Sequence, residues 1–171
     1  HDIPLCAVLH SAAALKSDEH AKYQVYLDIA RLLIKYGASL SAKDNRWERT
    51  PLHWAAYYNL VPFIQLFLAQ AKKDSVCFDI NVLDYFYDTP LHLAARDRYY
   101  TVCYLLIKAG ANLFWLNTAK FSAGSLLFDD TFFDWEKSNL SEADFEACQL
   151  TAYASRRIYC CLEQKIPTEY H

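Results

Sequence analysis

The sequence predicts an all-α protein built from consecutive repeats, and three observations carry this prediction. The segment TPLHWAA at residues 50–56 recurs as TPLHLAA at residues 89–95, and a worn copy, AVLHSAA, occupies residues 7–13. An apolar run follows each copy. The runs after the first and third copies each end beside a glycine, Gly37 or Gly110. Recurrence at this kind of spacing indicates a repeat architecture.

These segments resemble the ankyrin-repeat family, in which about 33 residues form a hairpin followed by two antiparallel helices. The resemblance implies an ankyrin-repeat solenoid of helix-turn-helix units joined by short hairpin connections. It extends from near the start of the chain to about residue 121. The motif is specific, because most of its residues have an identifiable physical task.

The Thr-Pro pair predicts a sharp helix start. The hydroxyls of Thr50 and Thr89 can accept a hydrogen bond from an unpaired helical amide. The proline that follows loses nothing at the first helical position, where its missing N–H would have no partner. The next leucine points toward the core, and the paired alanines let neighbouring helices approach closely. Gly37 and Gly110 suit the end of a second helix, because glycine adopts the left-handed conformation at little cost.

In chain order, the three repeats are predicted at about residues 1–45, 46–84 and 85–117. The matched segments within them begin at residues 7, 50 and 89, which are 43 and then 39 residues apart, against about 33 for the family. We assign the excess to loops near residues 14–24 and 72–78, because surface loops tolerate insertions.

Two family positions carry unexpected residues. Ala71 stands where the second repeat would have its glycine, and Tyr87 replaces the hairpin glycine of the third repeat. A glycine at such positions permits a positive φ that other residues adopt only at a cost. The shapes of these two turns are therefore left open.

The last part of the chain, residues 122–171, keeps less of the pattern. Residues 122–127 (SAGSLL) stand where a fourth repeat would start and indicate a degenerate repeat. A capping-box pattern at residues 141–144 and an apolar stripe from Phe145 to Leu162 predict a helix. This helix either caps the open end of the stack, because terminal repeats must shield the core, or forms a separate partner-binding element.

The composition favours a protein partner. Aromatic residues make up 16% of the 171 residues, which is too many for a small core, and Tyr and Trp are enriched at interfaces. A formal net charge of -3 gives no reason to expect a nucleic-acid partner. No apolar stretch reaches the roughly 18 residues of a membrane span. We therefore expect a soluble domain that does not insert into membranes and is monomeric in isolation.

The six cysteines, at positions 6, 77, 103, 148, 160 and 161, show no disulfide framework. We expect reduced thiols in a cytoplasmic protein. The chain begins at His1 and contains no Met, which predicts a fragment of a longer protein.

The sequence predicts no catalytic site, no cofactor and no metal site. With three glycines in total, the chain lacks the phosphate-binding loops of nucleotide enzymes. Adjacent Cys160 and Cys161 are poorly spaced for zinc. His10, His53 and His92 recur at one repeat position, and the resemblance implies that these histidines hydrogen-bond neighbouring groups rather than act in catalysis.

The resemblance also implies where a partner binds. Hairpin positions before the motif, and the two residues after the paired alanines, line a concave groove in this family. The predicted partner-binding residues are Arg46, Trp47, Arg49, Tyr57, Tyr58, Tyr85, Phe86, Asp88, Arg96 and Asp97, with Glu48, Phe114 and Trp115 extending the set. Trp, Tyr and Arg dominate binding energy at many interfaces. The alternative for Trp47 and Phe86 is packing between hairpins.

Two functional hypotheses follow. The first is a protein–protein interaction module with an unidentified protein partner. The second is a substrate-recognition or targeting domain of a larger enzyme, adaptor or bacterial effector. In addition, residues 79–81 resemble the hairpin sites of intracellular ankyrin-repeat proteins that an asparaginyl hydroxylase modifies, which would make Asn81 a modification site.

Overall fold

The computed structural model describes residues 3–15, 20–74 and 78–127, together with residues 135, 138, 139 and 141. Within these residues the chain is helical, and β pairing there is limited to an isolated antiparallel bridge between Leu116 and Ser122. The helices in chain order are α1 (Pro4–Ala13), α2 (His20–Lys35), α3 (Pro51–Tyr57), α4 (Val61–Asp74), α5 (Pro90–Arg96), α6 (Tyr100–Lys108) and α7 (Ala123–Leu127).

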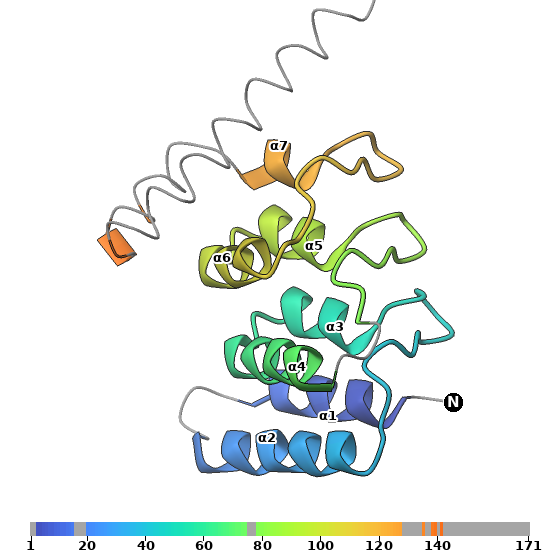
Figure 1. The fold of residues 1–171 in the computed structure, drawn as a ribbon, viewed down its shortest axis with the longest axis vertical. Helices are drawn as coiled ribbons and strands as arrows, with labels where there is room; N and C mark the ends of the chain where they lie inside the picture. The colour runs from blue at the N-terminus through green and yellow to red at the C-terminus, as the bar shows by residue number, and fades with distance from the viewer. Residues whose placement is uncertain are drawn as a thin grey trace, which may run out of the picture.

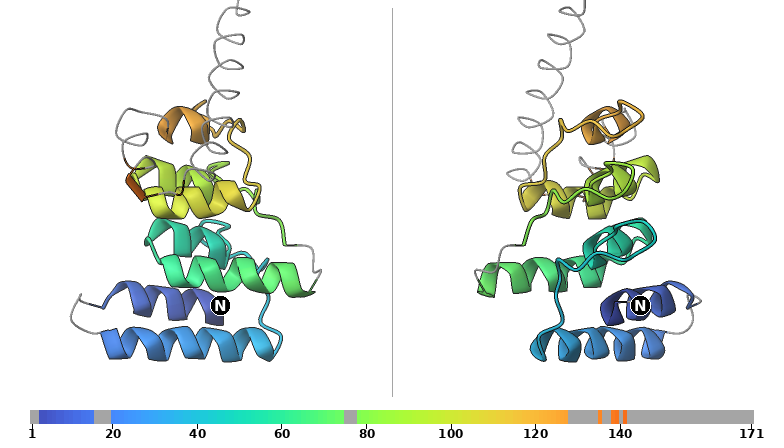
Figure 2. Two further views of the ribbon diagram at one scale, coloured as in Figure 1. Left: turned by 60° about the vertical axis from the view of Figure 1, so that its left-hand side comes forward. Right: turned by 90° about the vertical axis from the view of Figure 1, so that its right-hand side faces the viewer.

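The helices form pairs that stack in layers (Figures 1 and 2). Each first helix packs against its second helix, as α1 does against α2, and the first helices α1, α3, α5 and α7 also stack on one another. Three hairpins project from the same side of the stack in Figure 1. We number them hairpin 1 (residues 44–49), hairpin 2 (residues 84–88) and hairpin 3 (residues 117–121). The predicted all-α ankyrin-repeat solenoid is confirmed.

The Thr-Pro pairs begin α3 and α5, as predicted. The Thr89 hydroxyl accepts a hydrogen bond from the His92 backbone N–H at 3.3 Å, and the Thr89 backbone N–H donates to His92 Nδ1 at 3.2 Å. The same box begins α3, where the Thr50 N–H donates to His53 Nδ1 at 3.2 Å. Each reciprocal pair satisfies two backbone amides that the helix itself leaves unpaired.

In the first repeat, the helix begins one turn before the matched segment at residues 7–13. Ile3 is the N-cap of α1 and Pro4 lies in its first turn. The proline determines this start, because its fixed φ suits the first helical position and its missing N–H needs no partner there. Cys6 therefore stands at the third helical position, which the capping histidines occupy in α3 and α5. The alignment of His10 with those two histidines is corrected accordingly.

The core runs between the layers and uses the same helix positions in each repeat. Leu5, Leu52 and Leu91 are at most 1% exposed. The paired alanines of α3 and α5 are likewise at most 1% exposed, and their small side chains let the first helices stack closely. Burying a leucine completely contributes about 1.5 to 3 kcal/mol, so this repeated leucine anchors each layer.

The second helices have unequal lengths, which corrects the assignment of the extra residues to loops. Helices α2 and α4 contain 16 and 14 residues, whereas α6 contains 9. Residues 20–24 and 72–74 are helical, so part of each insertion lengthens a helix. Ala71 lies inside α4, because alanine continues a helix where glycine would end it. Gly37 and Gly110, with φ of 89° and 95°, end α2 and α6 as predicted.

A capping pattern also begins α7. The Ser125 N–H donates to Ser122 Oγ and the Ser122 N–H donates to Ser125 Oγ, each at 3.1 Å. Ser122 follows Thr89 by 33 residues, and Ser125 takes the role that His92 has in α5. The short helix α7 packs on α5.

The predicted helix beyond Ser141 lies outside the described residues, apart from Ser141 itself. Trp135 is described, and its ring lies near two tyrosines of α6. The ring centroids of Tyr100 and Tyr104 are 6.0 Å and 6.4 Å from that of Trp135. The chain beyond α7 therefore contacts the outer helix of the third repeat at this residue.

Candidate protein-binding surface

Each hairpin begins with an acidic or amide residue that holds its shape. A side-chain oxygen of this residue accepts hydrogen bonds from backbone N–H groups of the same hairpin at 2.7 to 3.0 Å. The three residues are Asp44, Asp84 and Asn117. Such side-chain to backbone bonds are typical of Asx-type turns. They satisfy the backbone within each hairpin and so fix the direction of the side chains at its tip.

The bonds to Asp44 also change its acidity. Burial on its own would raise the pKa of the Asp44 carboxyl. The backbone N–H groups of Trp47 and Arg46, and the indole N–H of Trp54, outweigh burial and lower this pKa below its ordinary value. The Asp44 carboxylate is therefore ionised near neutral pH, and its charge is compensated inside the hairpin.

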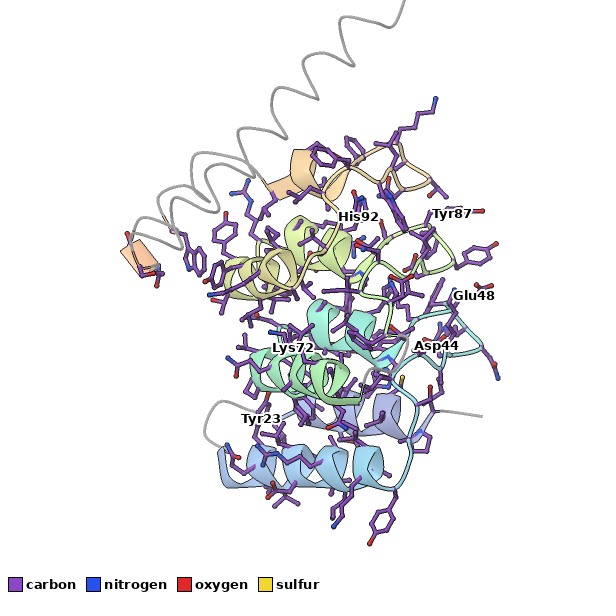
Figure 3. The ribbon with its side chains drawn as sticks, in the orientation of Figure 1. Tyr23, Asp44, Glu48, Lys72, Tyr87 and His92 are labelled. Carbon is purple, nitrogen blue, oxygen red and sulfur yellow. The ribbon has the colours of Figure 1, made fainter. Side chains whose placement is uncertain are left out.

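The hairpins turn through a left-handed residue two positions before each helix N-cap. Glu48, Tyr87 and Lys120 have φ of 54°, 61° and 62°. Tyr87 thus keeps the left-handed turn without the glycine of the family pattern, which answers the question that the sequence left open. Figure 3 shows Glu48 and Tyr87 at the tips of neighbouring hairpins.

Backbone hydrogen bonds connect adjacent hairpins. The Tyr85 N–H donates to the Trp47 carbonyl at 2.9 Å, and the Thr118 N–H donates to the Phe86 carbonyl at 3.0 Å. These two bonds hold hairpin 2 between its neighbours. The three tips therefore form a continuous row of backbone along the stack.

Two of the predicted partner-binding residues lie in the interior of this row. Arg49 and Asp88 are only 8% and 5% exposed. Arg49 Nε donates to Asp84 Oδ2 at 3.0 Å, and Asp88 Oδ1 accepts from Asn117 Nδ2 at 2.8 Å. Each bond joins one hairpin to the next. The structure therefore places both side chains where they join repeats.

The buried Arg49 guanidinium has further partners. It lies 5.0 Å from the ring centroid of Trp54 and 5.3 Å from that of Tyr57. The Trp54 indole N–H donates to Asp44 Oδ2 at 2.9 Å. A buried charge is tolerated when it is paired and its donors are used. This network fixes Tyr57 relative to hairpin 1.

Trp47 and Phe86 pack between hairpins and remain partly accessible. Their ring centroids are 5.5 Å apart, and Phe86 is 38% exposed. The Arg46 guanidinium lies 5.2 Å from the Trp47 ring centroid on the exposed side of hairpin 1. Tyr85 packs edge-on against Phe86 at 5.3 Å and is 63% exposed. These predicted residues combine inter-hairpin packing with an accessible surface.

Tyr57 and Tyr58 form a half-buried aromatic cluster with Trp54 and His10. The rings of Tyr57 and Tyr58 are 5.0 Å apart, and Tyr58 stacks on Trp54 at 5.7 Å. His10 of α1 meets Trp54 edge-on at 4.6 Å. The cluster therefore spans the first helices of two repeats. The sequence prediction missed His10 as part of this surface because it aligned His10 with the capping histidines His53 and His92.

Arg96 and Asp97 lie at the end of α5, where both are exposed. The Arg96 guanidinium approaches the Asp88 carboxylate at 3.7 Å. Its side chain is 48% exposed, so water screens this pair and it contributes little to stability. Both residues are accessible to a partner.

The exposed apolar side chains concentrate on hairpin 2, on hairpin 3 and on residues 114–116 directly before hairpin 3. We call this set the hairpin face, and it consists of Tyr85, Phe86, Tyr87, Phe114, Trp115, Leu116 and Phe121. Tyr87, Leu116 and Phe121 were absent from the prediction. Aligning Asn117 with Asp84, each five residues before a helix N-cap, would have identified the third hairpin and its flanking residues. A second exposed apolar set lies on α2, at Val25, Ile29 and Leu32, and continues to Tyr36 directly after the helix.

The two capping histidines have a structural role, as the resemblance implied. Because His53 Nδ1 accepts a backbone N–H, Nε2 carries the proton and donates to the Asp88 carbonyl at 3.1 Å. His92 Nε2 in turn lies 2.9 Å from the Trp115 carbonyl and 3.2 Å from the Phe121 carbonyl of hairpin 3. Burial lowers the pKa of His53 to about 4 and also lowers the pKa of His92. Both rings therefore remain neutral near physiological pH and join each repeat to the next hairpin.

Asn81 also connects repeats. Its side-chain oxygen accepts a hydrogen bond from the Asn112 backbone N–H at 2.6 Å. The residue at the corresponding position of the next repeat is Phe114, which is 41% exposed. The same position is thus structural in one repeat and accessible in the next.

Sites for small ligands are poorly developed in the described part of the chain. These described residues contain no group of three or more His, Cys, Asp or Glu side chains that could hold a metal ion. A cleft of about 300 Å³ between the ends of α2 and α4 is lined mainly by small and apolar residues. None of the described helices has the length and hydrophobicity that a membrane crossing requires.

The repeats and the row of hairpins agree with the comparisons with known proteins. The sequence profile described as "Ankyrin repeats (3 copies)" matches residues 9–114. The chain is 32% identical over 91 residues to "Putative E3 ubiquitin-protein ligase XBAT31" of Arabidopsis thaliana, covering 50% of this chain and 20% of that protein. It is 34% identical over 85 residues to "Ankyrin repeat and SOCS box protein 3" of Homo sapiens, covering 49% and 15%. The match to the relatives thus spans a fifth or less of their length, and the family profile covers most of this chain. The chain belongs to the ankyrin-repeat family.

Proposed function

We propose that this chain is a protein-interaction module that binds its partner with the hairpin face and the adjoining first-helix surface of α3 and α5. The observation that carries the proposal is the concentration of seven exposed apolar side chains on two adjacent hairpins and the segment that leads into the second of them. Exposed apolar patches on soluble domains mark interaction sites when they are larger than scattered single residues. Ankyrin repeats in general bind proteins, which supports this assignment.

The side chains of this surface divide into two roles. Arg46, Trp47, Tyr57, Tyr58, Tyr85, Phe86, Arg96 and Asp97 contact the partner, together with the remaining residues of the hairpin face. Arg49 and Asp88 are positioning residues, because their side chains are buried and bonded to the next hairpin. Because the hairpin tips are already fixed in the free chain, less conformational entropy is lost when a partner binds.

The role is one of recognition, without a catalytic step in this chain. A second candidate function is substrate recognition within a larger protein, either an enzyme or an adaptor. It is favoured by the names of the two relatives, an E3 ubiquitin-protein ligase and a SOCS box protein, of which the matched segment is a small part. In that case the hairpin face selects the protein on which the larger assembly acts.

The test compares proteins captured from a cell lysate by the wild-type chain and by two matched variants. The first variant carries Tyr85→Ser with Tyr87→Ser, which removes two exposed rings of the hairpin face. The second carries Tyr36→Ser, which removes a ring that is 83% exposed in the turn directly after α2. We expect quantitative mass spectrometry to find partners lost from the first variant and kept by the second. Equal capture by all three proteins would refute the proposed surface.

The two candidate functions differ in what happens to the captured protein. If the hairpin face selects substrates, replacing the wild-type chain in its full-length context by the Tyr85/Tyr87 variant should change the abundance or modification state of that protein in cells. If the chain only assembles partners, association should be lost while abundance and modification stay constant. Measurement of both by mass spectrometry separates the two.

A further inference from the structure

We propose that the hairpin face binds an acidic protein segment, one that carries aromatic or aliphatic side chains between its carboxylates. This inference rests on the proposed function and specifies the chemistry of the partner. It follows from the distribution of compensated and uncompensated charge around the exposed rings.

The three aspartates of hairpins 1 and 2 are compensated within the fold, and Glu48 is the exposed carboxylate at these tips. Asp84 is 3% exposed and pairs with Arg49 at 3.0 Å. Asp88 is 5% exposed, accepts a hydrogen bond from the Asn117 amide at 2.8 Å and lies 3.7 Å from the Arg96 guanidinium. Asp44 accepts hydrogen bonds from two backbone amides and the Trp54 indole. These three aspartates therefore project little negative charge toward a partner.

The cations at the tips are accessible and less compensated. Arg46 on hairpin 1 and Lys120 on hairpin 3 are exposed, and neither forms an ion pair with a carboxylate among the described residues. Lys43 is also exposed, with Glu48 at 3.5 Å as its partner. Accessible positive charge therefore exceeds accessible negative charge along the tips, although the whole chain has a formal net charge of -3.

The order of these groups along the stack determines what fits. Arg46 on hairpin 1 comes first, the rings of hairpin 2 follow, and Lys120 lies on hairpin 3. The hydrogen bonds between Tyr85 and Trp47, and between Thr118 and Phe86, keep the tips in this order. A segment lying along the tips would meet a cation, then an apolar stretch, then a cation. Carboxylates flanking apolar side chains complement this pattern in both charge and hydrophobicity.

A single-stranded nucleic acid is the competing occupant, because aromatic side chains beside cations also bind stacked bases. The number of cations argues against it. Nucleic-acid affinity depends on many phosphate contacts, and the tips present Arg46, Lys120 and a Lys43 that already has a carboxylate partner. An acidic protein segment obtains most of its binding energy from the apolar contacts and needs few charge pairs.

The experiment is a selection from a phage-displayed library of random 12-residue peptides on the wild-type chain. We expect the selected peptides to be enriched in both Asp or Glu and aromatic or aliphatic residues. The affinity of a fluorescently labelled selected peptide should fall about tenfold in the double variant Arg46→Gln and Lys120→Gln. It should stay constant in Arg31→Gln, which removes a cation that is 55% exposed on α2. Raising NaCl from about 100 mM to about 500 mM should remove most of the difference between wild type and the double variant.

Each other outcome has a definite meaning. Peptides that need Tyr85 and Tyr87 but show no acidic enrichment would overturn the inference and leave the proposed function in place. Peptides that bind the Tyr85→Ser, Tyr87→Ser variant as tightly as the wild type would overturn both. Failure to select any peptide, or tight binding of a labelled 12-nucleotide oligouridine that the Arg46/Lys120 variant loses, would overturn the inference alone. The lysate experiment remains the independent measure of the proposed function.

Discussion

Single side chains hold the hairpin turns in a backbone conformation that favours glycine. Glu48, Tyr87 and Lys120 each have a positive φ, and a residue other than glycine costs about 1 to 3 kcal/mol in that region. The bonds from Asp84 and Asn117 to the backbone of hairpins 2 and 3 compensate for this cost. The turns therefore keep their shape while presenting side chains that glycine would lack.

Replacing Lys120 by glycine should stabilise the fold. Lys120→Gly removes the strain of a Cβ at a φ of 62°, and the added entropy of glycine in the unfolded chain offsets part of the gain. We expect a net increase of about 1 kcal/mol in the free energy of unfolding, measured by urea denaturation. The control Lys120→Ala keeps the Cβ and should change stability by less than about 0.5 kcal/mol. Equal stability of the two variants would show that the turn is unstrained.

The buried histidines make stability depend on pH. The pKa of His53 is lowered to about 4 in the folded chain because burial disfavours its charged form, whereas an unfolded histidine titrates near pH 6.5. The unfolded state therefore binds a proton first as the pH falls. Stability from this residue is complete above about pH 6.5 and is lost between about pH 6.5 and pH 4. His92 contributes in the same direction.

We expect the urea midpoint to fall steadily between about pH 6.5 and pH 4, with each titrating histidine contributing at most about 1.4 kcal/mol per pH unit. His53→Asn should be less stable near pH 7, because it loses the hydrogen bond to the Asp88 carbonyl. The same variant should have a shallower dependence on pH than the wild type. A wild-type midpoint that stays constant over this range would contradict the assignment.

The alignment of the three hairpins depends on the side-chain bonds that connect one hairpin to the next. Arg49 and Asp84 form a buried ion pair 35 residues apart in the chain, and Asp88 bonds Asn117 across the next interface. Removing one member of a buried pair leaves the other charge without compensation. The alignment of the tips, and with it the proposed binding surface, depends on these pairs.

Asp84→Asn should therefore be strongly destabilising. Asparagine retains an oxygen for the backbone amides of hairpin 2 but leaves the Arg49 guanidinium without its carboxylate. We expect a loss of about 3 kcal/mol or more in the free energy of unfolding. The matched change Asp97→Asn, at an exposed residue of the same type, should alter it by less than about 0.5 kcal/mol. Similar urea midpoints for the two variants would mean that the buried pair contributes little.

Much of this arrangement could be predicted from local sequence. The Thr-Pro starts, the buried leucines and the paired alanines follow from rules that act within one helix. The start of α1 was missed because Ile3 is a poor cap, so that only Pro4 marks it. The burial of Arg49 and Asp88 could not be predicted, because it depends on partners about 30 residues away. The exposure of Tyr87 and Phe121 depends likewise on the geometry of neighbouring hairpins.

How well the apolar core is shielded from water depends on the two ends of the stack. Helix α7 covers α5, and Trp135 packs near Tyr100 and Tyr104 of α6. A solenoid requires terminal units with a polar outer face. These contacts support the proposal that residues 122–171 cap the stack, rather than form a separate partner-binding element.

Deleting residues 141–171 tests this proposal. If the segment caps the stack, the truncated chain should melt at a lower temperature and should aggregate, because apolar surface of the last repeat becomes exposed. Scanning calorimetry and light scattering measure the two effects. A truncated chain that melts like the parent and remains monomeric would favour the alternative of a second partner-binding element.

The third position of the first helix differs between repeats: it is Cys6 in α1, His53 in α3 and His92 in α5. We expect this difference to determine which end of the stack unfolds locally first. His53 contacts the Asp88 carbonyl of hairpin 2, and His92 contacts the Phe121 carbonyl of hairpin 3. A thiol is a weaker hydrogen-bonding group than an imidazole. The interface after the first repeat should thus open more often than the interface after the second. Amide hydrogen exchange followed by mass spectrometry should show α1 and α2 losing protection before α5 and α6. Local unfolding would then begin at the first repeat, while the hairpins that carry the exposed rings keep their structure.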